Sequence, residues 1–253
     1  MLVLLPPSET KWAGPPRGRP VALDRLSFPA LSAAREQVLD ALVDVSTQPD
    51  AAAVLGTSAG LADVVAANAT LRTRPAAPAA AVYRGVLYDA LDLPTLPTAA
   101  GRRVLVVSAL WGLLHPRDRV PGYRLSMGTT LPGPGPLAPF WRRHLTEVLE
   151  PSGVVVDCRS AAYAAAWAPD RATAARTAAV RVLSGASVVS HAAKHTRGLV
   201  ARHLLTRPGR PPRTVAALAE AVREAFDVEL LAPARAGASW TLQVQAPPSA
   251  TGA

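Results

Sequence analysis

Apolar residues fall along the chain in runs of two kinds. Short runs of the length of a buried strand begin the chain at 2–5 and recur at 104–108 and 154–160. Longer segments repeat apolar residues at three- and four-residue intervals, which predicts amphipathic helices at 31–45, 140–149, 191–205 and 213–226. In the first helix the apolar stripe consists of Leu31, Val38, Leu42 and Val45. Ser27 or Ser32 is the expected N-cap of that helix.

Turn-forming residues divide the remaining segments. The glycines of Gly56 to Gly60 split a helical region at about 50–71 into two short helices, and Pro132 to Pro139 predicts an extended connector. A Ser184-Gly185 turn predicts paired strands at 178–183 and 186–190.

The end of the chain is expected to hold one more strand, at 240–244, and then a disordered tail at 245–253. No internal repeat is evident. The predicted domain therefore spans 1–244.

The stretch from Val104 to Met127 is where the pattern indicates a site. It begins as a buried strand, passes through Trp111, and ends in the loop that carries Tyr123 and Arg124. Strands that run directly into such loops are where α/β proteins usually bind ligands. We expect Arg124 to act there, with Tyr123 beside it and with Trp111 and Met127 as walls.

Composition limits the class of protein. No apolar run reaches membrane-spanning length, and the N-terminus has neither the basic nor the long apolar region of a signal peptide. The single cysteine, Cys158, excludes an internal disulfide. We therefore expect a soluble cytoplasmic protein with no membrane association.

The chain carries 27 basic and 18 acidic residues, for a net charge of +9 and a pI near 10.9. Such a charge favours polyanionic partners, although a general excess of arginine would produce it as well. Only two of the 27 basic residues are lysines, Lys11 and Lys194. Because arginine is used nearly everywhere else, these two positions suggest sites that need a compact ammonium group.

Cationic and acidic side chains supply the candidate chemistry. Lys194 and Arg197 share one face at the start of a helix, where they could bind an anion. Lys11 follows the first strand, as Glu9 does, and Asp157 follows a later strand. Either carboxylate could carry a proton or anchor a substrate, although single carboxylates more often cap helices or form ion pairs.

Several other chemistries are not expected. His191 and His195 lie one helical turn apart, with His203 further along, but the glutamate of a zinc-hydrolase helix is missing. Ser8, Ser108 and Ser126 lack the context of a nucleophilic serine, and Cys158 follows three valines, as an inert buried thiol does. Since no phosphate-binding loop or dinucleotide motif is present either, no metal and no cofactor are expected.

All four tyrosines, Tyr83, Tyr88, Tyr123 and Tyr163, fall in segments rich in charged and turn-forming residues. Aromatic faces beside arginines suit the stacking of nucleobases. Tyrosines also pack at the edge of a core with their hydroxyl groups satisfied, so this pattern favours a nucleotide or nucleic-acid ligand only modestly.

Taken in order, these motifs resemble the peroxide stress protein YaaA family, also called the UPF0246 or DUF328 family. The matching segments are MLVLLPPSETK at 1–11, YRGVLY at 83–88, SALWGLLHPRD at 108–118, YRLSMG at 123–128, PFW at 139–141, VVVDCRSAAY at 154–163 and KHTRG at 194–198. They cover nearly the whole chain in the order of the family.

The resemblance implies a single α/β domain with a central mixed sheet, flanking helices, a helix-hairpin-helix-like element and a positively charged cleft. It also implies DNA binding and a role in limiting oxidative damage linked to iron. By the same resemblance, the cleft cations would be Lys11, Arg124, Lys194 and Arg197, with Tyr83, Tyr88, Tyr123 and Tyr163 as their aromatic neighbours.

Two departures from the family pattern indicate a divergent member. The opening PSETK replaces a PAKT-type motif and adds Glu9, and the segment from Gly56 to Gly60 lacks lysines.

Three functions remain open from the sequence. The first is a non-enzymatic protein that binds double-stranded DNA or a nucleotide-like anion. The second is an enzyme acting on a nucleotide, nucleobase or other small anion, in which Lys11 and Lys194 act with Glu9 or Asp157. The third is an interaction module. Convergence of the cations on a narrow tyrosine-walled pocket would favour the enzyme, and a groove wide enough for a duplex would favour DNA binding.

Overall fold

The computed structural model of the protein describes residues 1–183 and 189–246. Within these residues, seven strands form a central sheet in the order β10–β11–β9–β8–β1–β3–β4. The strands are β1 (Leu2–Leu5), β3 (Val104–Ser108), β4 (Gly112–Leu114), β8 (Val155–Asp157), β9 (Thr177–Leu183), β10 (Val228–Leu231) and β11 (Trp240–Gln245). The inner strands pair in parallel, whereas β4 and β10 pair antiparallel at the two edges. The predicted mixed α/β sheet is confirmed.

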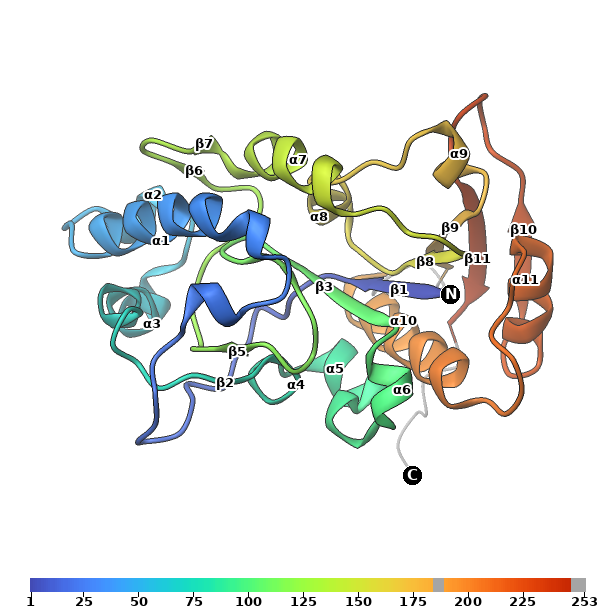
Figure 1. Ribbon diagram of the computed structural model, residues 1–253, viewed down its shortest axis with the longest axis horizontal. Coiled ribbons are helices and arrows are strands. Elements are labelled where there is room, and N and C mark those ends of the chain that lie inside the picture. The colour runs from blue at the N-terminus through green and yellow to red at the C-terminus, as the bar shows by residue number, and fades with distance from the viewer. Residues whose placement is uncertain (184–188, 247–253) are drawn as a thin grey trace.

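The helices that surround the sheet are α1 (Ser32–Ser46), α4 (Ala79–Val82), α5 (Val86–Leu91), α6 (Thr98–Gly101), α7 (Leu137–Val148), α8 (Ala161–Ala164), α9 (Arg171–Ala174), α10 (Val189–Thr206) and α11 (Val215–Arg223). In the view of Figure 1, α5, α6 and α10 lie below the strands and α7 lies above them. Helix α1 lies at one end of the molecule, and α11 lies beside β10 at the other. Two-stranded pairs, β2 (Ala77–Pro78) with β5 (Arg119–Val120) and β6 (Thr130–Leu131) with β7 (Gly135–Pro136), complete the fold.

Burial explains why the inner strands are continuous apolar runs. Val3, Leu4 and Leu5 of β1 are fully buried, and every residue of β3 is buried. A parallel strand covered on both faces has no solvent side, so its sequence does not alternate between apolar and polar residues.

The position of β1 in the sheet determines where a ligand can bind. The chain leaves β1 to form β3 on one side of it and later forms β8 on the other side. The ends of β1, β3 and β8, at Leu5, Ser108 and Asp157, therefore meet at a switch point of the sheet order, where α/β proteins bind ligands.

The glycine-bearing break between two short helices is confirmed. Helix α2 (Ala51–Val54) is followed by a turn in which Gly56 has a φ of 61°, and then by α3 (Ala62–Ala66). A left-handed residue at the end of a helix is typically glycine, because a side chain there is strained.

The expected caps of α1 are wrong. Its N-cap position is Leu31, and no side chain caps it. The Ser27 hydroxyl donates instead to Asp118 at 2.9 Å, and the Ser32 hydroxyl donates to the carbonyl of Leu23. Tertiary partners therefore replaced the local capping that was predicted.

Three further boundaries differ from the prediction. Helix α7 begins at Leu137, inside the expected connector, because proline is tolerated in a first helical turn. Val189 and Ser190 begin α10 rather than ending a strand, and 184–188 lie outside the described residues. Strand β9 pairs with β8 and β11. Strand β11 extends to Gln245, and the rest of the expected tail beyond 246 lies outside the described residues.

None of the helices in the described part of the chain is long and apolar enough to cross a membrane.

Candidate functional site

The turn that follows β1 places Lys11 at the carboxyl edge of the sheet. Within the turn, the Ser8 hydroxyl donates to the carbonyl of Thr10 at 2.5 Å. Lys11 then forms an isolated antiparallel bridge with Tyr83, and the amide of Arg84 donates to Thr10 at 3.2 Å. These bonds attach the turn to the segment between α4 and α5, so that Lys11 faces inward.

The ammonium group of Lys11 lies over aromatic rings. Its Nζ is 4.3 Å from the ring centroid of Tyr123 and 5.7 Å from that of Tyr83, and it donates to the carbonyl of Ser8 at 2.5 Å. Burial, reinforced by the positive charge of Arg124 and opposed by Glu9, lowers the pKa of Lys11 to about 7. A large fraction of this amine is therefore neutral at physiological pH and can accept a proton or attack an electrophile.

Three buried hydroxyl groups lie next to this amine. Ser108 Oγ is 2.7 Å from Tyr123 Oη, which is 3.2 Å from Tyr83 Oη. The Ser108 oxygen also accepts from the amides of Leu110 and Trp111, which fills both of its lone pairs. Ser108 must therefore donate to Tyr123, whose hydroxyl also shares a hydrogen bond with that of Tyr83.

The other two tyrosines form the inner wall of a pocket. Tyr88 stacks on Tyr83 with ring centroids 5.3 Å apart and donates to the carbonyl of Pro6 at 2.7 Å. Tyr163 belongs to α8 and is buried. Burial raises the pKa of all four tyrosines, so each hydroxyl stays protonated.

An ion pair lies at the rim of this wall. Arg124 Nη2 is 2.7 Å from Glu9 Oε2, and Arg124 Nη1 donates to the Glu9 carbonyl at 3.3 Å. The backbone of Arg124 is fixed by the buried side chain of Asn68, whose amide exchanges two 2.9 Å hydrogen bonds with it. This arrangement aims the guanidinium toward the turn after β1.

A cavity of about 180 Å³ lies between this turn, α5 and α10. Glu9, Tyr88 and Tyr163 line it together with the cations Arg84, Lys194 and Arg197. Arg197 is oriented by a hydrogen bond from its Nε to the carbonyl of Val180 at 3.2 Å. With three cations against one carboxylate, the cavity suits a small anion.

Asp157 forms a buried ion pair, whereas a catalytic carboxylate has to be free to contact a substrate. Its oxygens accept from Arg159 Nε at 2.8 Å and Nη2 at 2.7 Å, and Arg159 also donates to the carbonyls of Tyr163 and Trp167. This buried pair holds the strand end and α8 together. Burial and the Asp157 charge raise the pKa of Cys158 to about 12, which keeps its thiol protonated.

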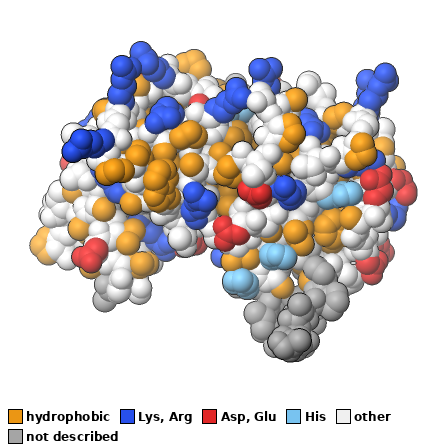
Figure 2. All heavy atoms as spheres, turned by 90° about the horizontal axis from the view of Figure 1, so that it is seen from below, with side chains coloured by type: hydrophobic (Ala, Val, Ile, Leu, Met, Phe, Trp, Pro, Cys, Tyr) orange, Lys and Arg blue, Asp and Glu red, His pale blue; other side chains and the backbone are white. Residues whose placement is uncertain are grey.

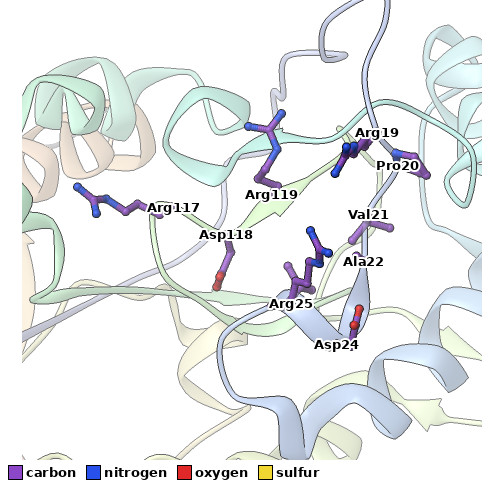
Figure 3. Close-up of a pocket in the computed structure, with 10 residues that line it drawn as sticks. Arg19, Pro20, Val21, Ala22, Asp24, Arg25, Arg117, Asp118 and Arg119 are labelled. Atoms are coloured by element: carbon purple, nitrogen blue, oxygen red, sulfur yellow. The ribbon is translucent and has the colours of Figure 1, made fainter.

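A second, larger cavity lies away from Lys11. Figure 2 shows basic side chains spread over one face of the molecule among apolar patches. The cavity, about 810 Å³, lies where the segment 19–26 meets 117–119. Figure 3 shows the guanidinium groups of Arg19, Arg25 and Arg119 gathered on one side of it, while Arg117 extends away.

The structure places the predicted residues in two groups that share Glu9, and Lys11, Arg124, Tyr83, Tyr123 and Asp157 are not among the residues that line the cavity. Lys11 contacts Tyr83 and Tyr123, Glu9 pairs with Arg124, and Lys194 and Arg197 share the cavity with Tyr88 and Tyr163. No role for Ser108, Asn68 or Arg84 was predicted from the sequence. Only Arg84 carried a signal, since it lies between Tyr83 and a glycine in the YRGVLY motif.

The sheet topology defines an α/β protein, and a cavity lined by Tyr88, Tyr163, Arg84, Lys194 and Arg197 lies at the switch point of its sheet. A family model described as peroxide stress protein YaaA matches residues 1–229, so the chain belongs to that family.

Relatives support the assignment. A UPF0246 protein of Streptomyces coelicolor is 50% identical, with 96% of this chain and 98% of the relative aligned. A UPF0246 protein of Corynebacterium efficiens is 41% identical over 89% of this chain and 93% of its own. A UPF0246 protein of Salinispora tropica is 31% identical over 87% of each chain.

Proposed function

We propose that the protein is an enzyme of the peroxide stress response that acts on a small, nucleotide-like anion. The observation that carries the proposal is the Lys11 amine, which lies on the rings of Tyr83 and Tyr123 and donates to the carbonyl of Ser8, a residue that lines the cavity. Amines with lowered pKa values in such surroundings serve as bases and nucleophiles. The family description supplies the link to peroxide stress.

Each residue has a defined part in this proposal. The cations of the cavity, Lys194 and Arg197, bind the negative charge of the substrate. Lys11 accepts a proton from the substrate and holds it as an ammonium group on the rings of Tyr83 and Tyr123.

The size of the cavity favours a small ligand over a duplex. Ligand cavities of drug-sized molecules occupy about 300–1,000 Å³. At about 180 Å³, this one matches a phosphate with a few attached atoms, and only the charged end of a nucleotide would enter it.

The test is to compare the wild type with Lys11→Met and Lys194→Met. Nucleotides and sugar phosphates are screened for turnover by NMR and for binding by calorimetry. Lys11→Met should abolish turnover while affinity stays within a few fold, and Lys194→Met should mainly weaken binding. If both variants keep the turnover and affinity of the wild type, the proposal is wrong.

Double-stranded DNA is the second candidate ligand. The larger cavity favours it, because Arg19, Arg25 and Arg119 present three guanidinium groups on an open surface. Arginine contacts to phosphate of this kind bind DNA without regard to sequence. The α2–α3 hairpin would then be a further contact. Mobility shifts with duplex DNA across a range of salt concentrations test whether the protein binds DNA.

A further inference from the structure

Arg124 is mounted more rigidly than the carboxylate it pairs with. Both backbone hydrogen-bonding groups of Arg124 are held by Asn68, a fully buried side chain. Its own side chain is 20% exposed, whereas that of Glu9 is 59% exposed on a turn. A fixed cation paired with an exposed carboxylate is an arrangement in which the carboxylate can be replaced at small cost.

Glu9 also lines the cavity that holds Arg84, Lys194 and Arg197. Arg124 itself does not line this cavity, so its ion pair with Glu9 is what connects it with the cations inside. An anion that enters the cavity meets Glu9 beside the cations that would bind it, and the two negative charges compete for the same partners.

We propose that this cavity binds a phosphate monoester dianion and that Glu9 is the internal counter-ion which such a ligand displaces from Arg124. The inference rests on the proposed function and adds the class of ligand and the residue that this ligand displaces.

The preference for a dianion over a monoanion follows from the charges that each ligand would bring to the site. A monoanion that replaced Glu9 on Arg124 would exchange one negative charge for another, with little gain. A dianion satisfies Arg124 and still brings a second charge to Lys194 and Arg197. Phosphate monoesters carry close to two negative charges above their second pKa of about 6, whereas sulfate monoesters of the same shape carry one.

The position of Glu9 agrees with this role. It belongs to the same turn as Ser8, whose carbonyl accepts from Lys11. Displacement of Glu9 would therefore move the segment that covers the Lys11 amine, so that anion binding and access to the amine become coupled. The charge of Glu9 also raises the pKa of Lys11, and a bound dianion would take over this effect.

The experiment measures the binding of methyl phosphate and methyl sulfate at pH 8 by calorimetry. The proteins are the wild type, Glu9→Gln, Arg124→Gln and the double variant, with Glu147→Gln as a matched removal of one exposed charge on α7. The wild type should prefer methyl phosphate by about tenfold or more. Glu9→Gln should strengthen the binding of both ligands by about tenfold, because neither ligand then has to displace a carboxylate from Arg124. Glu147→Gln should change neither affinity.

The double variant separates competition for Arg124 from simple repulsion. If Glu9 acts by occupying Arg124, the gain from Glu9→Gln disappears when Arg124 is already replaced. A gain that persists in the Arg124→Gln background, or no gain at all, would overturn the inference while leaving the proposed function intact. Failure of both the wild type and Glu9→Gln to bind either ligand would overturn the inference too. The proposed function fails by a separate criterion, unchanged turnover and affinity in both Lys11→Met and Lys194→Met.

Discussion

At the scale of single residues, Lys11 is placed where an arginine could not serve. Its ammonium is small enough to lie on the Tyr123 ring at 4.3 Å while donating to the carbonyl of Ser8. A guanidinium is larger and holds its proton at any physiological pH. The amine, in contrast, loses its charge easily when burial and Arg124 act against it.

The lowered pKa of Lys11 predicts how stability depends on pH. Between the folded pKa of about 7 and the ordinary value of 10.5, the unfolded chain binds a proton that the folded protein does not. Stability therefore rises with pH in this window, by at most about 1.4 kcal/mol per pH unit. Denaturant unfolding of the wild type and Lys11→Met between pH 7 and 9 measures the difference. Parallel curves for the two proteins would contradict the prediction.

The buried pair of Asp157 and Arg159 gives a second residue-scale prediction. Asp157→Asn leaves the Arg159 guanidinium, 1% exposed, without its charge partner. Such changes cost about 3–5 kcal/mol. Urea unfolding should show this destabilisation, whereas Asp63→Asn, on the surface of α3, should stay within about 0.5 kcal/mol of the wild type. An Asp157→Asn protein as stable as the wild type would assign the carboxylate a role other than holding the strand end.

Individual site residues were predictable to different degrees. Lys11 stood out because lysine is rare in the chain, and Arg124 stood out because it lies beside Tyr123 in the loop that follows a buried strand. Asn68 could not be assigned, since its two bonds reach Arg124 across 56 residues of sequence. The Ser108 hydroxyl was considered only as a nucleophile, because its tyrosine partner becomes a neighbour only in the folded chain.

At the scale of elements, α10 positions the cavity cations by packing closely on α5. Gly198, which directly follows Arg197, makes this approach possible. A Cβ atom built there would overlap the carbonyl oxygen of Leu87 and lie 2.8 Å from the Cβ of Ala90. The glycine in the KHTRG motif is therefore required by helix packing.

Replacing this glycine should separate the two helices. Gly198→Ala is expected to destabilise the protein by about 1–3 kcal/mol, as overpacking does. It should also weaken anion binding, because Arg197 moves with the helix. Gly101→Ala is the matched control, since a Cβ at the end of α6 meets nothing within 4 Å. Thermal melts measure the stability of both variants, and calorimetry measures their affinity for the anion. Equal stability of Gly198→Ala and Gly101→Ala would contradict the close packing of α10 on α5.

The strands were predicted correctly from the sequence where both faces of the strand are buried. Strands β1, β3 and β8 are apolar up to the polar residues Ser108 and Asp157 that end β3 and β8, because both faces are covered. Strand β10 was not predicted, since only its first residue, Val228, is buried and a glutamate follows. Its pairing with β11 depends on a partner that the local pattern does not reveal.

At the scale of the whole molecule, the net charge and the size of the smaller cavity favour different classes of ligand. The net charge of +9 and the open arginine surface suit an extended polyanion, whereas the pocket beside Lys11 suits one small anionic group. The sequence indicated both possibilities. It could not rank them, because the width of a cavity depends on how distant segments pack.

The two surfaces can be separated by mutation. If DNA binds the arginine surface, Arg25→Gln with Arg119→Gln should weaken binding and reduce the slope of log affinity against log salt by about two, because each arginine neutralises one phosphate. Lys194→Met should leave that slope unchanged, because Lys194 lies in the other cavity. Mobility shifts at several salt concentrations provide the slopes. A slope that drops with Lys194→Met instead would place the DNA over the smaller cavity.

The most direct test of the central claim is the titration of the Lys11 amine. Since the chain contains two lysines, a protein labelled with ¹³C at the lysine ε-carbon gives two NMR signals, which Lys11→Met and Lys194→Met assign. The Lys11 signal should titrate with a midpoint at a pH of about 7. A midpoint near the ordinary lysine value of 10.5 would contradict the claim that this buried amine is the reactive group of the site.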